Sequence, residues 1–138
     1  MRMIRNPFPY HGVNGINLLS NRIRKERRKN NIEFISLFLG NIIRMQEEAG
    51  TGGSGFRYMY AAFLQEAAHK LQQNKLAGLS EEMTTIGDRW RDFAICASRI
   101  IKARISLTEG FNDIDLILRE ISEKERELFT KLNRMPLT

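Results

Sequence analysis

Four glycines within six residues form the stretch with the clearest potential for chemistry. They are Gly50, Gly52, Gly53 and Gly55, and Phe56-Arg57 follows directly. A phosphate-binding Walker loop needs a preceding strand and a Gly-Lys-Ser/Thr ending, because its lysine must reach the phosphates. Here the preceding segment has helical periodicity and no such ending follows, and a dinucleotide-binding fingerprint fails in the same context. The sequence therefore disfavours a nucleotide-binding loop.

A turn between two helices accounts for the same glycines. We expect Gly50 to end one helix in a left-handed C-cap and Ser54 to cap the next. Free backbone N–H groups at that helix start, with Arg57 in its first turn, would suit one anionic group. Alternatively, Arg57 pairs with Glu47 or Glu48 across a tight turn. The residues alone favour this ion pair.

The basic run RIRKERRK, from Arg22 to Lys29, is a second candidate. Residues 1–30 hold eight basic residues and one acidic residue (+7), whereas residues 31–138 hold 14 and 15 (−1). Plotted at 100° per residue, the basic side chains spread around a helix, and no aromatic residue stands among them to stack on bases. The run indicates a solvated helix end, and nucleic-acid binding through it is the alternative function.

The sequence offers few groups for catalysis or metal binding. Its one cysteine, Cys96, stands among apolar residues, and its histidines are His11 and His69. A nucleophilic cysteine needs a lowered pKa and a base within reach, so we expect Cys96 to be a buried, inert thiol. Glu66 and His69 have the spacing of a di-iron helix, but a second such motif is missing. We expect no catalytic residue, metal or cofactor.

The segment IGDRWRDFA, residues 86–94, is dense in charged residues. Asp88 and Arg91 are three residues apart, as are Arg89 and Asp92, so both pairs can bridge on a helix surface. The residues Asp88, Arg89 and Arg91 are our candidate partner surface.

Three other residues of this segment predict its packing. Trp90 and Phe93 are expected to turn into the core. Gly87 costs about 1 kcal/mol relative to alanine inside a helix, which indicates close packing or a ligand beside it.

These residues must be positioned by helices, because the apolar periodicity is helical almost throughout. We expect an all-α fold, with residues 1–138 forming a single-domain bundle of about five mostly antiparallel helices. The first expected helix spans residues 14–29, the second 33–48, and the third runs from the glycines to about 76. The fourth begins with Ser80 as N-cap, and the fifth begins at Asn112 or Asp113 and ends at Pro136.

The apolar patterns of two helices predict which sides are buried. The second helix should be buried on more than one side, through Ile35, Leu39, Ile42, Ile43 and Met45. The third has one face formed by Phe56, Tyr60, Phe63, Ala67 and Leu71, and alanines that allow close approach, namely Ala61, Ala62 and Ala68. The most apolar run, residues 32–45, is too short and interrupted to span a bilayer. We expect a cytoplasmic protein without a signal peptide.

The stretch GTGGSGFRYMYAAFLQEAA, residues 50–68, followed by residues 86–94, resembles the C-terminal helical domain of the butirosin biosynthesis protein H family. The pattern GTGG-x-x-FR-x-x-Y-x-x-FL-x-EA matches throughout, and residues 11–23 look like the helix that opens that domain. The resemblance implies acyl transfer from an acyl carrier protein to an aminoglycoside amine by a papain-like cysteine enzyme. We expect the nucleophile in an N-terminal catalytic domain that is absent here.

The resemblance also implies roles for residues of the glycine-rich turn. It marks Gly52, Gly53, Ser54, Arg57 and Tyr60 as candidate ligand-binding residues, with Arg57 facing a carboxylate or a phosphopantetheine phosphate. The expected function is a non-catalytic helical domain that completes the acyltransferase fold and docks substrate or carrier protein. Expected partners are the N-terminal catalytic domain or a separate protein in its place, an acyl carrier protein, and a second copy that covers an exposed apolar patch.

Overall fold

The computed structural model describes residues 12–29, 31–45 and 54–136. Its helices are α1 (Gly12–Arg28), α2 (Ile32–Ile43), α3 (Ser54–Leu71), α4 (Asn74–Ile101) and α5 (Leu107–Arg134). Within these ranges there is no strand. The predicted all-α bundle of five helices is confirmed.

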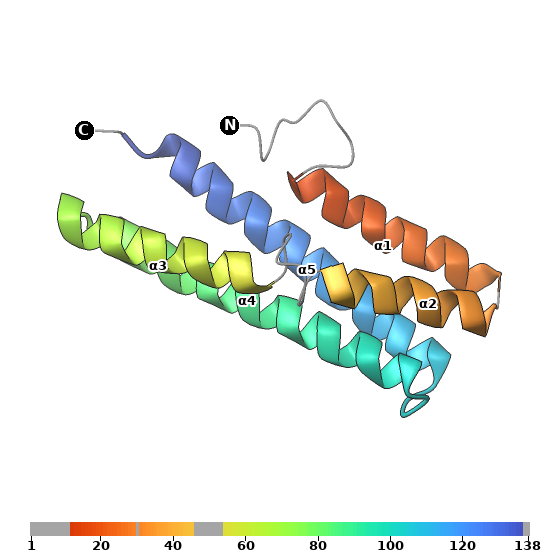
Figure 1. The fold of residues 1–138 in the computed structure, drawn as a ribbon. Coiled ribbons are helices and arrows are strands. Elements are labelled where there is room, and N and C mark those ends of the chain that lie inside the picture. The colour runs from red at the N-terminus through yellow and green to blue at the C-terminus, as the bar shows by residue number, and fades with distance from the viewer. Residues whose placement is uncertain (1–11, 30, 46–53, 137–138) are drawn as a thin grey trace.

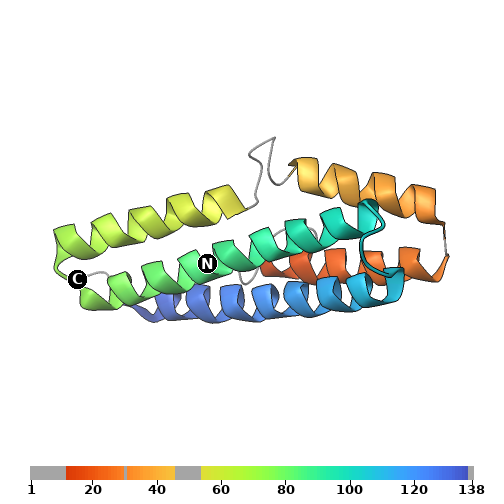
Figure 2. The ribbon, with the colours of Figure 1, turned by 90° about the horizontal axis from the view of Figure 1, so that it is seen from below.

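The helices form two layers around the long α4–α5 hairpin. Helices α2 and α3 lie end to end along α4, and α1 lies along α5 (Figures 1 and 2). Neighbouring helices in contact run antiparallel, as predicted. Helix α3 begins near the end of α2, and its first turns lie beside the middle of α4 (Figures 1 and 2).

The core lies where α4 and α5 face each other and receive the inner sides of the other helices. Phe93, Leu118 and Ile114 are fully buried there, and Trp90 packs edge-on against Phe93 with ring centroids 5.8 Å apart. Both aromatic residues thus turn inward, as predicted.

The start of α4 differs from the prediction. The helix begins at Asn74, and Ser80 lies inside it, where its buried hydroxyl donates a 2.7 Å hydrogen bond to the Ala61 carbonyl oxygen of α3. The turn before α4 depends on Gln72, whose positive φ of 51° reverses the chain. Ser80 followed by two glutamates resembled an N-cap, but its hydroxyl is used between helices. Helix α3 accordingly ends at Leu71, five residues before the predicted end.

The start of α5 was also predicted too late. Ser106 is the N-cap, and its side chain accepts a 3.2 Å hydrogen bond from the Glu109 backbone N–H. Ser106 Oγ also lies 2.8 Å from Glu109 Oε2, so the two residues form a local cap pair. The helix therefore begins about one and a half turns before Asn112.

Helices α2 and α3 are buried on one side each. On α2 the buried residues are Ile35, Leu39 and Ile42, whereas Phe34 and Leu37 are exposed. The prediction that α2 is buried on several sides is wrong, because its buried residues form one stripe within the described part of the chain, and the predicted Met45 is exposed. None of the described helices carries an apolar stretch long enough to cross a membrane.

The buried stripe of α3 is formed by small residues and one leucine. Ala61, Leu64 and Ala68 face inward, which confirms the close approach expected at two of the three alanines; Ala62 is exposed. The aromatic side of α3 is the outer one, with Phe56 and Phe63 exposed. Small inner side chains let α3 lie close to α4, and the rings of Phe56 and Phe63 are left outside.

Candidate functional site

The first turn of α3 places Arg57 in a buried polar cluster. Its Nε and Nη2 atoms donate to Glu125 Oε1 of α5 at 2.9 and 2.7 Å. Trp90 Nε1 of α4 donates to the same oxygen at 3.2 Å, and the guanidinium lies 4.9 Å from the Trp90 ring centroid. Glu125 is 1% exposed. These three side chains, which we call the Arg57 cluster, join α3, α4 and α5.

The cluster identifies a carboxylate that faces Arg57. The predicted partners of Arg57 are an external anion or, alternatively, Glu47 or Glu48, and these two glutamates lie outside the described residues. Among the described residues, Arg57 pairs with Glu125, 68 residues away. Within the described ranges, its second oxygen, Oε2, is buried without a hydrogen-bond partner. A carboxylate in this environment depends strongly on its cation, because few other groups replace the lost water.

The other predicted ligand-binding residues are distributed along the start of α3. Ser54 is the first helical residue and is buried. The Tyr60 ring packs between Phe63 and Phe129, at centroid distances of 5.8 and 6.0 Å, and burial raises the pKa of its hydroxyl. Gly52 and Gly53, like Gly50, lie outside the described residues. Of the predicted ligand-binding residues that the structure describes, Ser54 and Tyr60 therefore pack within the bundle and Arg57 belongs to the Arg57 cluster.

Asp88 and Arg91 both turn to Tyr58 of α3. The Tyr58 hydroxyl donates a 2.6 Å hydrogen bond to Asp88 Oδ1, and the Arg91 guanidinium lies 5.4 Å from the Tyr58 ring centroid. The predicted Asp88–Arg91 bridge is not among the ion pairs of the described residues. Burial, then the hydrogen bond and charge of Asp88, raise the pKa of Tyr58, and Arg91 acts in the opposite direction. The ring thus replaces the expected salt bridge.

Gly87 is explained by the same tyrosine. A Cβ atom at position 87 would lie 2.8 Å from Tyr58 Cε1. The prediction of close packing at this glycine is therefore confirmed, and the contacting group is a side chain of the protein.

Arg89 forms the predicted bridge and one more. Its Nη1 lies 2.7 Å from Asp92 Oδ2, and its Nη2 pairs with Glu120 of α5. Together, the three residues of the candidate partner surface connect α4 to α3 on one side and to α5 on the other.

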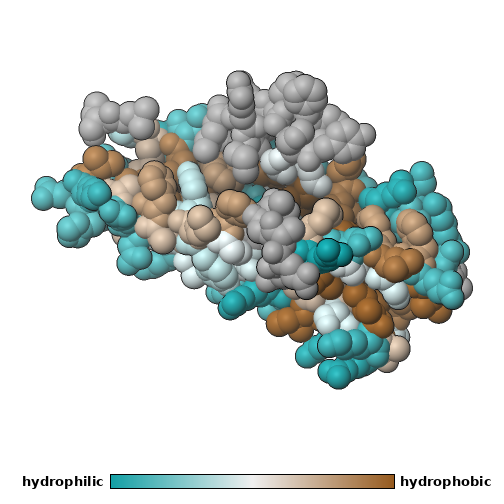
Figure 3. Space-filling view, in the orientation of Figure 1, coloured by the Kyte–Doolittle hydropathy of each residue, from teal (hydrophilic) through white to brown (hydrophobic). Residues whose placement is uncertain are grey.

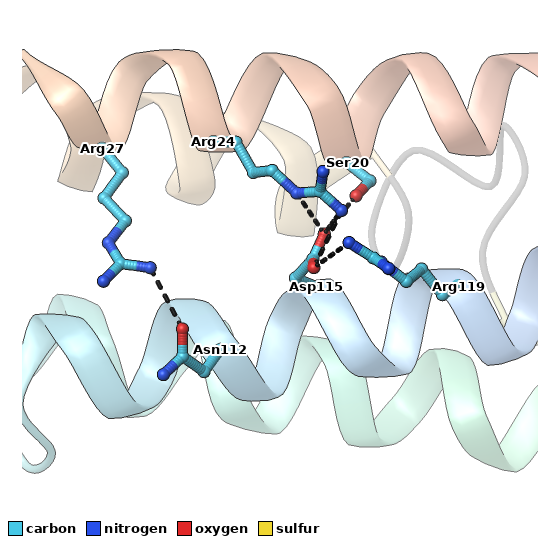
Figure 4. A network of polar contacts seen from close by, with 6 residues as sticks. All are labelled: Ser20, Arg24, Arg27, Asn112, Asp115 and Arg119. Carbon is cyan, nitrogen blue, oxygen red and sulfur yellow. Dashed lines mark hydrogen bonds and ion pairs between the residues drawn. The ribbon is translucent and has the colours of Figure 1, made fainter.

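A second polar network joins α1 to α5 around Asp115 (Figure 4). Its Oδ1 accepts hydrogen bonds from Ser20 Oγ at 2.6 Å and Arg24 Nε at 2.8 Å, and its Oδ2 accepts from Arg24 Nη2 at 2.9 Å. Arg119 of the next turn lies 3.0 Å from the same carboxylate. Burial alone would raise the pKa of Asp115, but the hydrogen bonds and the two arginine charges together lower it.

This network predicts a pH dependence of stability. Because folding lowers the pKa of Asp115 below its ordinary 3.8, its contribution is present above that value and is lost as the pH falls below it. Asp115→Asn should reduce the free energy of unfolding at pH 7 by roughly 1–2 kcal/mol and should flatten its decline in acid. Urea unfolding at several pH values measures both effects. A variant whose stability declines in parallel with the wild type would contradict the assignment.

Most cations of the basic run are exposed but have partners within the protein. Four of its six cations have partners: Arg22 and Lys29 pair with buried Glu26, Arg24 with Asp115, and Arg27 donates to Asn112. Lys25 and Arg28 are exposed. The predicted solvated helix end is confirmed, because five of the six cations are exposed, and two of the six, Arg24 and Arg27, also connect α1 to α5. Because four of the six cations have partners within the protein, fewer positive charges are left to bind nucleic acid than the composition indicates.

Cys96 is buried, as predicted. Its thiol lies 3.5 Å from the Gly110 carbonyl oxygen, and burial, followed by the charge of Asp113, raises its pKa. Such a thiol carries little thiolate at neutral pH and is a poor nucleophile. Across the described ranges no group of three or more His, Cys, Asp or Glu residues could hold a metal ion, and Glu66 instead pairs with Lys70 at 2.9 Å.

Large apolar side chains gather on the side of α2 and α3 that faces away from α4. We call this the outer face and define it by Phe34, Leu37, Phe56, Met59 and Phe63, which are all exposed. Leu37, Met59 and Phe63 are each more than 60% exposed. Brown surface over parts of α2 and α3 is visible in Figure 3. Apolar groups concentrated in this way are typical of a protein interface.

Comparisons with known proteins place the chain in a family. Neither the curated proteins nor the solved structures gave a match. One family model, described as "Domain of unknown function (DUF4872)", matches residues 1–132. Because this match covers nearly the whole sequence, the chain belongs to the DUF4872 family.

Proposed function

We propose that this chain is the non-catalytic helical domain of a butirosin-H-like acyltransferase and that its outer face docks the catalytic domain. The observation that carries the proposal is the exposure of Phe56 and Phe63. Both belong to the sequence pattern by which the chain resembles that family, yet neither is buried in this helical bundle. A contact outside the bundle gives these residues a function.

The chemistry of the described residues agrees with a supporting role. Cys96 is buried beside the Gly110 carbonyl, with its pKa raised. The candidate ligand residue Arg57 is held by Glu125. Both groups therefore stabilise the bundle, and acyl transfer is assigned to the catalytic domain. Substrate or carrier-protein docking would then take place on the assembled enzyme.

A single substitution tests the docking role of the outer face. The probe is a separately produced catalytic domain of a butirosin-H-like enzyme, mixed with this chain and followed by sedimentation velocity. Phe63→Lys should weaken the complex at least about tenfold, because it places a charge in an apolar contact. Leu116→Lys on α5 is the matched control, since Leu116 is similarly exposed but lies outside the outer face.

The outcomes separate the possible occupants of this surface. A complex that tolerates Leu116→Lys but not Phe63→Lys supports the proposal. Equal binding by both variants, or no complex with the wild type, contradicts it. If the chain alone forms a dimer that Phe63→Lys dissociates, the outer face belongs to a second copy instead.

A further inference from the structure

The outer side of the last turns of α4 contains a hollow that the proposed function does not use. Its volume is about 640 Å³, and its described lining comes from α4 and the turn that follows, through Arg91, Ala94, Ile95, Ser98, Arg99, Lys102 and Arg104. We call it the basic hollow. Four of these residues are cations and none is acidic, so the local charge is strongly positive.

The cations of the basic hollow differ in their contacts from the arginines of the polar networks described above. Arg24, Arg57 and Arg89 are each neutralised by a carboxylate. By contrast, Arg99, Lys102 and Arg104 form none of the ion pairs found in the described part of the chain, and they are all exposed. Arg91, the fourth, contacts the Tyr58 ring.

The turn after α4 fixes the backbone at Arg104, the last cation of the basic hollow. The Arg104 backbone N–H donates to the Arg99 carbonyl at 2.9 Å, and the Ala103 N–H donates to Ile100 at 3.0 Å. This pair of bonds closes the helix end with Ala103 in the left-handed conformation, at φ 50°, a position that glycine usually occupies. The closed turn fixes the backbone of Arg104 next to that of Arg99, and both residues line the basic hollow.

We propose that the basic hollow binds a small molecule with two or more negative charges, of the diphosphate class. Its volume lies in the range of small-molecule sites, about 300–1,000 Å³. Guanidinium groups bind phosphate oxygens through paired, charge-assisted hydrogen bonds, and three arginines and one lysine line this hollow. The exposed side chain of Ile95 and the neighbouring Ala94 supply an apolar wall for the rest of the ligand.

The site is tested with inorganic pyrophosphate as the probe. Isothermal titration calorimetry at low ionic strength, about 50 mM, should show saturable binding of one pyrophosphate per chain. In Arg99→Gln/Arg104→Gln, the dissociation constant should rise at least about tenfold, because two of the four cations are removed. The matched control is Lys25→Gln/Arg28→Gln on α1, which removes the same charge from exposed residues elsewhere. It should change the constant by less than about threefold.

Three results would overturn the proposal. The first is no saturable binding up to about 10 mM pyrophosphate, far above the affinity of a specific site. The second is equal weakening in both double variants, since this indicates attraction to overall charge. The third is a short polyglutamate peptide that binds at the hollow when pyrophosphate does not, which would assign the surface to an acidic protein partner. Circular dichroism on both variants verifies that they remain folded.

Discussion

Arg57→Met is expected to reduce the free energy of unfolding by about 3–5 kcal/mol, because it leaves the carboxylate of Glu125 buried without its cation. Glu125 is 1% exposed, its Oε2 atom has no hydrogen-bond partner, and the Trp90 N–H would be the remaining donor to Oε1. Methionine retains much of the length and apolar stem of arginine, so the loss reports mainly on charge. Equilibrium unfolding in urea measures it.

Two further variants separate the charge from the packing. Arg57→Met/Glu125→Leu removes both charges together and should recover most of the lost stability, because no unpaired ion remains. Lys70→Met removes the cation of the exposed Glu66–Lys70 pair and should leave the unfolding midpoint nearly unchanged. If Arg57→Met is as mild as Lys70→Met, or if the double variant is the least stable of all, the role given to the Arg57 cluster is wrong.

Gly110→Ala should have the second large effect, a loss of about 1–3 kcal/mol by overpacking. A Cβ atom at position 110 would overlap Ile100 Cγ1 and lie 2.8 Å from both Ile100 Cδ1 and Ile105 Cδ1. Ile100 is buried, so it has little space to move away. The crowding outweighs the gain of up to about 1 kcal/mol that alanine brings to a helix interior. Thermal and urea unfolding both report the change.

The matched control for this substitution has the opposite expected sign. Gly78 lies in α4, is exposed, and has nothing within 4 Å of an added Cβ atom. Gly78→Ala should therefore stabilise the protein by roughly 0.5–1 kcal/mol. A stabilising Gly110→Ala would show that the contact between the two helix ends is looser than described.

The sequence predicted the helices well because each carries an apolar stripe of helical period, as in α5 from Ile114 to Leu128. It failed at helix starts where a capping residue has another use or competes with a second candidate. Ser80 carries the local features of an N-cap, yet its hydroxyl bonds to Ala61 of another helix. Ser106 and Glu109 form the cap of α5, whereas the predicted start is at Asn112 or Asp113.

The candidate site was predictable only in part, because its key contacts are distant in sequence. Close packing beside Gly87 was predictable, because a glycine inside a helix costs stability and therefore indicates a neighbour that lies close to it. No local pattern pairs Arg57 with Glu125 across 68 residues. The exposure of Phe56 and Phe63 was not predictable either, because it also depends on contacts that are distant in sequence. Which side of an amphipathic helix faces outward depends on the neighbour it packs against, here α4 through Ala61 and Leu64.

The pairing of α1 with α5 has a consequence for synthesis on the ribosome. Ser20 and Asp115 are 95 residues apart, and every helix between them must be made before they can meet. At roughly 5–20 residues per second, that interval is about 5–20 seconds. During this time Ile16 and Ile23, which belong to the core that α1 and α5 share, are not yet covered by α5. The high charge of the basic run in the same helix would help to keep these apolar residues of α1 from aggregating until α5 has been made.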